Sequence, residues 1–182
     1  MASGAQSADP GGDAQALRIQ ANTQWSRNAF DEADASWSRA AELLTGLQDW
    51  RRLGDLQGER ALALFNHGRE DDAERVWMSG LAAYEAAGAL AEQARTLRNL
   101  TFLRRLSRDE RLLLARRAVD AAVVSGDPVV EGSARHQLSD QLYGAGDIAG
   151  ASEHLHLAVA LLERGPESIG QARALTRAGR LH

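Results

Sequence analysis

The sequence contains no cysteine and no lysine, and these two absences exclude several classes of site. Without cysteine the chain can form no disulfide, no zinc–thiolate centre and no cysteine nucleophile. All 21 basic residues are arginines, which also excludes a P-loop lysine and a Schiff-base lysine. The formal net charge of -4 gives no basic excess of the kind that direct nucleic-acid binding requires.

Strand-like segments, prolines and long apolar runs are also scarce. Only 3 prolines occur, no segment of useful length alternates between apolar and polar residues, and no apolar run approaches the ~18 residues that span a bilayer. The opening stretch MASGAQSADPGGDAQ is small and polar, without the regions of a signal peptide. We therefore expect a disordered tail over residues 1–12, a single domain over residues 13–182, a cytoplasmic location and no membrane contact.

A small–large–small pattern recurs along the chain. In each copy a turn is followed by a small residue, then by a large residue four positions on, and then by a small residue three positions later. The copies are Ala33, Trp37 and Ala40; Ala73, Trp77 and Gly80; Ala151, Leu155 and Ala158; and a degenerate copy, Arg111, Ala115 and Ala118. Their successive spacings are 40, 38 and 40 residues. Recurrence at a fixed period indicates a repeat protein, in which Arg111 should loosen the third unit or shift its register.

Each copy is preceded by a segment with apolar residues at steps of three and four, which is the period of a helix with one buried face. These segments are residues 14–27, about 49–66, about 90–105 and 128–143. The pattern predicts an all-α solenoid of about four helix-turn-helix units. We place the units at about 14–47, 48–87, 89–125 and 127–164, followed by a capping helix over 167–181.

The repeat resembles the tetratricopeptide repeat (TPR), in its long bacterial form. The best match is the stretch NAFDEA, in which Phe30 and Ala33 precede Trp37 and Ala40. The resemblance extends over roughly residues 14–164 and implies a right-handed α–α superhelix. The sequence departs from the family pattern in its longer unit, at Arg111, and at Gln20, Gln24 and Arg60, which stand where an apolar residue is usual.

One stretch, Gly144-x-Gly146-x-x-Ala149, matches the phosphate loop of dinucleotide-binding enzymes. That loop must follow a β-strand, whereas the residues before Gly144 have helical spacing. In the repeat alignment Gly146 occupies the place of Asn28 and Gly68, between the two helices of a unit. We therefore interpret the glycines as a turn.

No other motif indicates catalysis. His154 and His156 lie two positions apart, about 200° around a helix, so they cannot share a metal ion. The acidic cluster at residues 69–72 is explained by the helix dipole. We expect no enzyme activity, no cofactor and no metal site.

The resemblance implies a concave groove lined by the first helix of each unit. Its aromatic positions and their neighbours are Trp25, Phe65, Phe102, Arg105 and Tyr143. Its other positions are Arg18, Asn22, Gly58, Leu62, Arg95, Arg98, His136 and Asp140. Aromatic residues and arginine are enriched at binding hot spots. The alternative is that Phe65 and Tyr143 pack within their own units.

The spacing of Arg18 and Asn22 resembles the first half of the carboxylate clamp of some TPR proteins, although Gly58 or Glu59 stands where the clamp has asparagine. The sequence therefore predicts a non-catalytic module that binds a peptide or helical segment of another protein, one with acidic residues or a free carboxylate. An alternative is a sensor segment of a bacterial regulator that binds a short peptide or small effector. A third is self-association through Ile169, Ala172 and Leu175, so that both a monomer and a homodimer stay open.

Overall fold

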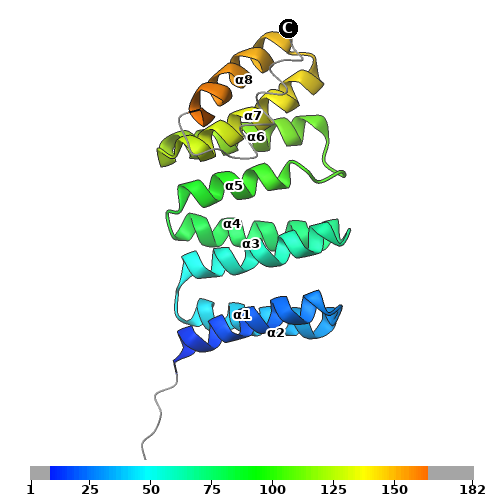
Figure 1. Ribbon diagram of the computed structural model, residues 1–182, viewed down its shortest axis with the longest axis vertical. Coiled ribbons are helices and arrows are strands. Elements are labelled where there is room, and N and C mark those ends of the chain that lie inside the picture. The colour runs from blue at the N-terminus through cyan, green and yellow to red at the C-terminus, as the bar shows by residue number, and fades with distance from the viewer. Residues whose placement is uncertain (1–8, 164–182) are drawn as a thin grey trace, which may run out of the picture. The chain divides into compact units, whose positions relative to one another are not determined.

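The computed structural model describes residues 9–163 and contains eight α-helices within them. They are α1 (Pro10–Ser26), α2 (Phe30–Gly46), α3 (Trp50–Asn66), α4 (Glu70–Ala86), α5 (Leu90–Leu100), α6 (Arg108–Ser125), α7 (Pro128–Ala145) and α8 (Ile148–Leu162) (Figure 1). No strand occurs among the described residues. The predicted all-α helical repeat is confirmed.

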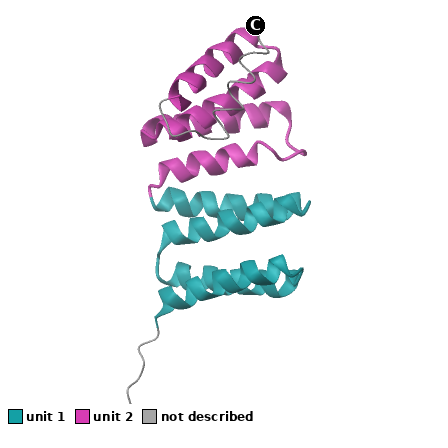
Figure 2. Ribbon diagram, in the orientation of Figure 1, with its two compact units in different colours: residues 1–87 teal, residues 88–182 magenta. Residues whose placement is uncertain are grey.

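The chain divides into two compact units, coloured separately in Figure 2. Unit 1 spans residues 1–87 and contains α1–α4, and unit 2 spans residues 88–182 and contains α5–α8. Within each unit every odd-numbered helix packs against the even-numbered helix that follows it. Among the described residues no helix combines the length and apolarity of a membrane-spanning segment.

The ends of the described range bear on two expected boundaries. Helix α1 begins at Pro10, with proline in the first turn, where its missing N–H costs no hydrogen bond. Residues 10–12, expected in the tail, are therefore helical. The expected capping helix 167–181, with Ile169, Ala172 and Leu175, lies outside the described residues.

The small–large–small triplets lie where the two helices of a pair pack closely. Ala33, Trp37 and Ala40 of α2 are all buried, as are the corresponding residues of α4 and α8. Small side chains let the helix backbones approach, and the large side chain fills the space beside them. The packing role predicted for these three copies is confirmed.

The third copy shifts its register, which is one of the two outcomes expected from Arg111. Arg111 is only half-buried, and the buried residues of α6 are Ala115, Ala118, Val119 and Ala122. Ala115, Val119 and Ala122 thus repeat the small–large–small spacing one helical turn later. A guanidinium would lose its hydration at a tight helix crossing, so a shift of one turn leaves Arg111 outside the packed seam.

The first helix of this pair is also shorter than expected. Helix α5 ends at Leu100, and Phe102 and Arg105, predicted on a helix, lie instead in the loop between α5 and α6. The cause is local: the Thr101 hydroxyl donates to the Arg98 carbonyl (2.7 Å), and a new helix starts at Ser107. There the Ser107 hydroxyl and the Glu110 carboxylate each accept a hydrogen bond from the other residue's backbone N–H, which forms a capping box.

We expect Ser107→Ala to destabilise unit 2 by about 1 kcal/mol, because it leaves an N-terminal N–H of α6 without its acceptor. Urea unfolding monitored by circular dichroism would measure the loss, and Ser107→Thr should retain most of the stability. The hydrogen bonds of Glu110 to Ser107 also lower the pKa of the Glu110 carboxyl. The stability that the Glu110 carboxylate adds by accepting the Ser107 backbone N–H is therefore present at neutral pH and is lost as the pH falls through the lowered pKa of Glu110. Equal stability of wild type and Ser107→Ala would contradict the role of the cap.

The Gly144–Gly146 stretch ends a helix, as the repeat alignment predicted. Gly144 lies in the last turn of α7, and Gly146 caps that helix in the left-handed conformation with φ of 86°. Asn28 and Gly68 have φ of 62° and 80° at the matching turns of unit 1. The dinucleotide-loop alternative is wrong, since no strand leads into these glycines.

A second set of small residues, not singled out in the sequence, lies early in the odd-numbered helices. Ala14, Gly54, Ala94 and Gly132 are each the fifth residue of their helix, and all are buried. A methyl group on Gly54 would lie 2.5 Å from the Tyr84 ring, and one on Gly132 would lie 2.7 Å from Leu162. Each glycine thus accommodates a large side chain from the last turn of the next helix.

Two polar residues at usually apolar positions form inter-helix contacts. Gln24 accepts a hydrogen bond from the Ser36 hydroxyl (2.8 Å), which joins α1 to α2. Arg60 of α3 pairs with Asp34 of α2 at 2.6 Å. Buried polar groups are tolerated when they are paired, and these pairs explain why Gln24 and Arg60 replace apolar residues.

Candidate functional site

Unit 1 contains an open groove between α1 and α3 with a volume of about 440 Å³. Its lining residues are Asn22 and Trp25 of α1; Glu59, Leu62, Ala63 and Asn66 of α3; and His67. The sequence predicted Asn22, Trp25 and Leu62 on one binding face, and the structure brings them together. It adds Asn66 and His67, which the sequence analysis missed.

The carboxylate of Glu59 is held by the two residues that resembled half of a carboxylate clamp. Arg18 Nη1 lies 3.4 Å from Glu59 Oε1, and the Asn22 amide donates to Glu59 Oε2 at 3.2 Å. Each carboxylate oxygen therefore meets one donor from α1. The positive charge of Arg18 is balanced inside the protein, so this groove is not basic as the sequence had suggested.

Apolar surface lies beside this polar cluster. Leu62 is 48% exposed and lines the groove. The half-buried Trp25 ring lies against Phe30, Trp37 and His67, at centroid distances of 4.7, 5.3 and 5.5 Å. Trp25 thus both packs within unit 1 and lines the groove, and its contacts fix the orientation of its ring.

Phe65, also predicted in the groove, packs instead within its own helix pair. Its ring lies 5.4 Å from that of Trp77 on α4, and it is not among the lining residues of the unit 1 groove. The alternative considered for Phe65, packing against the second helix of its unit, describes its position. The half-buried Gly58, on the same helix, does not line the groove either.

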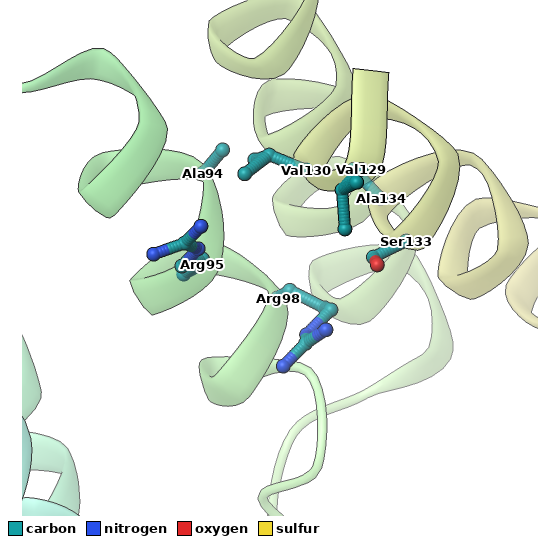
Figure 3. Close-up of a pocket in the computed structure, with 7 residues that line it drawn as sticks. All are labelled: Ala94, Arg95, Arg98, Val129, Val130, Ser133 and Ala134. Carbon is teal, nitrogen blue, oxygen red and sulfur yellow. The ribbon is translucent and has the colours of Figure 1, made fainter. Parts of the chain in front are cut away.

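Unit 2 has a smaller hollow of about 70 Å³ between α5 and α7 (Figure 3). Its lining residues are Ala94, Arg95 and Arg98 of α5 and Val129, Val130, Ser133 and Ala134 of α7. Figure 3 shows the two guanidinium groups on one side and Ser133 on the other. The hollow therefore combines apolar walls with two cations and one hydroxyl.

The positive charge in this hollow is only weakly balanced. Arg95 Nη2 lies 3.8 Å from Asp127 Oδ2, at an exposed position where such a contact contributes little. Arg98 donates to the neutral Asn99 side chain at 3.4 Å, and its Nε has no hydrogen-bond partner among the described residues. Burial, and secondarily the charge of Arg95, lower the pKa of the Arg98 guanidinium. A carboxylate placed here would gain two donors and relieve the repulsion between the arginines.

The remaining predicted residues do not line either hollow. His136 and Asp140 are half-buried on α7, and Tyr143 is exposed near the end of the same helix. Phe102 and Arg105 lie in the α5–α6 loop. The predicted set is therefore divided between the unit 1 groove, the unit 2 hollow, α7, this loop and positions of α3 outside the groove.

The two histidines of α8 make separate local contacts. His154 Nδ1 lies 3.4 Å from the Arg135 guanidinium, and burial, followed by the charge of Arg135, lowers the pKa of the His154 imidazole. His156 Nδ1 donates to the Ser152 carbonyl at 2.8 Å. The described residues include no group of three or more side chains arranged to hold a metal ion.

Comparison with known proteins supports the fold. No family model matches the sequence, and no curated protein matches it. Among solved structures, the crystal structure of BtubC (BKLC) from P. vanneervenii is similar, with a TM-score of 0.71 and 17% sequence identity. The similarity covers 91% of this chain and 70% of that one. At this identity the similarity shows a shared helical fold.

Proposed function

We propose that the chain is a non-catalytic, TPR-like module that binds a peptide or helical segment of another protein. The observation that carries the proposal is the unit 1 groove, in which an exposed leucine lies beside an aromatic ring of fixed orientation and two asparagines. Hot spots are enriched in aromatic anchors surrounded by groups that exclude water. A groove that is already formed leaves most of the ordering cost to the ligand.

The groove and the hollow suit different parts of a ligand. In the unit 1 groove Arg18 already pairs with Glu59, so an apolar side chain against Leu62 and Trp25 fits better than an acidic one. Asn66 has an amide that can pair with a peptide backbone. The hollow between Arg95 and Arg98 favours a carboxylate. We therefore assign the acidic preference expected from the sequence to unit 2 and an apolar preference to unit 1.

Leu62→Glu should reduce capture of the partner by about tenfold, because it places a charge in the apolar part of the groove. Ile19→Glu is the matched control: Ile19 is also an exposed apolar residue of unit 1, at 57%, but it does not line the groove. The measurement is affinity capture from the native cell with quantitative mass spectrometry, followed by the Kd of the captured segment for each variant.

Arg95→Glu combined with Arg98→Glu tests the acidic subsite separately and should weaken only ligands with a carboxylate. Circular dichroism must show the same helix content for all variants. If Leu62→Glu and Ile19→Glu capture the same proteins in equal amounts, the groove is not the binding site and the proposal fails.

A further inference from the structure

The loop between α5 and α6 is where the chain departs most from its own repeat. Residues 101–107 replace the last turns of a helix, yet they are held in place by a buried anchor. Leu103 is 0% exposed, and its backbone N–H donates to the Leu100 carbonyl at 3.2 Å. The Thr101 hydroxyl contact before it and the Ser107 capping box after it fix both ends. The loop is therefore preorganised.

Positive charge is concentrated around this loop. Six arginines but only two carboxylates occur between Arg95 and Arg111, in a chain with a net charge of -4. Over its described residues, unit 2 has nine arginines and ten carboxylates, so the surplus is local. Arg104, Arg105 and Arg108 are all exposed. The Arg108 side chain forms no hydrogen bond or ion pair with another described residue.

The same loop contains an exposed aromatic residue. Phe102 is 50% exposed, while the next residue, Leu103, anchors the loop in the core. An exposed aromatic residue in the same loop as exposed arginines is the composition of a binding hot spot. None of Phe102, Arg104, Arg105 and Arg108 lines the unit 1 groove or the Arg95–Arg98 hollow. The loop is therefore a separate surface.

We propose that the α5–α6 loop binds an acidic segment of a partner protein, with an apolar side chain of that segment against Phe102 and its carboxylates on Arg104, Arg105 and Arg108. Guanidinium groups match carboxylates in a two-pronged geometry. A short segment meets only the local positive surface. A nucleic acid or an anionic bilayer would extend beyond a Debye length of about 10 Å and meet the acidic remainder of the chain.

The test measures the Kd of the full chain for a fluorescein-labelled peptide by fluorescence anisotropy. The peptide alternates pairs of glutamates with single leucines. We expect Arg104→Glu with Arg108→Glu to raise Kd about tenfold or more, and Phe102→Ala to raise it severalfold. The matched control is Arg39→Glu with Arg75→Glu, two exposed arginines of unit 1 that change the net charge equally. This control should leave Kd within about twofold, because it changes the net charge of the chain without changing the loop residues that bind the peptide.

The proposal is overturned if the wild-type chain does not bind the peptide, or if the loop and control variants lose affinity equally. It is also overturned if Phe102→Ala and the Arg104→Glu, Arg108→Glu variant both bind the peptide as the wild type does. Tighter binding to phosphatidylserine vesicles or to single-stranded DNA than to the peptide would also overturn it. Leu62→Glu should bind the peptide normally. Failure of the loop is thus distinguishable from failure of the unit 1 groove, and circular dichroism of each variant checks the fold.

Discussion

Trp77→Ala is expected to destabilise unit 1 by about 3–5 kcal/mol, which is typical for truncating a fully buried tryptophan. Trp77 is 2% exposed and occupies the large position between Ala73 and Gly80. Neighbouring backbones can collapse only partly into the space that the indole leaves, because Phe65 and the small crossing residues already pack against it. Domain stabilities are about 5–15 kcal/mol, so this loss should unfold a measurable fraction of unit 1 at ambient temperature.

Two companion variants separate packing from other causes. Met78→Ala changes the next residue of the same helix, which is 49% exposed, and should alter stability by no more than about 0.5 kcal/mol. Trp77→Phe should cost less than Trp77→Ala, because the indole N–H donates to no other described residue and only volume is lost. Urea unfolding by far-UV circular dichroism measures all three. Equal midpoints for Trp77→Ala and Met78→Ala would show that Trp77 is not the large residue of the crossing.

Much of the fold could be predicted because its determinants are local and recur. The triplet with Trp37 and the triplet with Leu155 occupy the same positions in their helices, and Gly146 and Gly68 end helices in the same conformation. The prediction was wrong in the third unit, where α5 ends at Leu100 and not at about residue 105. There the start of α6 depends on the Ser107 cap as well as on the repeat spacing. The Ser107 capping box starts α6 about two turns before Ala115, its first crossing residue, whereas α2, α4 and α8 each start about one turn before theirs. The repeat spacing alone does not show where the cap starts the helix.

The binding surface was less predictable, because it depends on which charges the fold pairs internally. Arg18 and Glu59 are far apart in the sequence but adjacent on α1 and α3, and Arg60 is paired with Asp34. Helical spacing showed that Arg18 and Asn22 share a face, which is correct, but not that α3 supplies a carboxylate to that face. Arg98 and Arg108 are arginines whose positive charge is balanced by no carboxylate among the described residues. They can be identified only after the internal ion pairs are known.

The glycine at the start of α3 provides the second large effect. Gly54→Ala should destabilise unit 1 by about 2 kcal/mol, although alanine is the better helix former, because overpacking outweighs propensity. The added methyl group would lie 2.5 Å from the Tyr84 ring, and the ring cannot swing aside freely. It is buried, and its hydroxyl donates to Asp55 Oδ1 at 2.9 Å.

Gly58→Ala, one turn further along α3, is the matched control. Its methyl group would lie 3.7 Å from the Tyr84 hydroxyl oxygen, an ordinary contact, so only the gain in helix propensity should remain, about 0.5–1 kcal/mol. The two substitutions are chemically identical and are therefore expected to shift the urea midpoint in opposite directions. Gly132→Ala should repeat the loss in unit 2, where Leu162 and the Ala158 carbonyl lie against the glycine. A rise in midpoint for both Gly54→Ala and Gly58→Ala would mean that the fifth residue of each odd-numbered helix is not a packing determinant, and that the second helix of each pair is positioned by its crossing triplet alone.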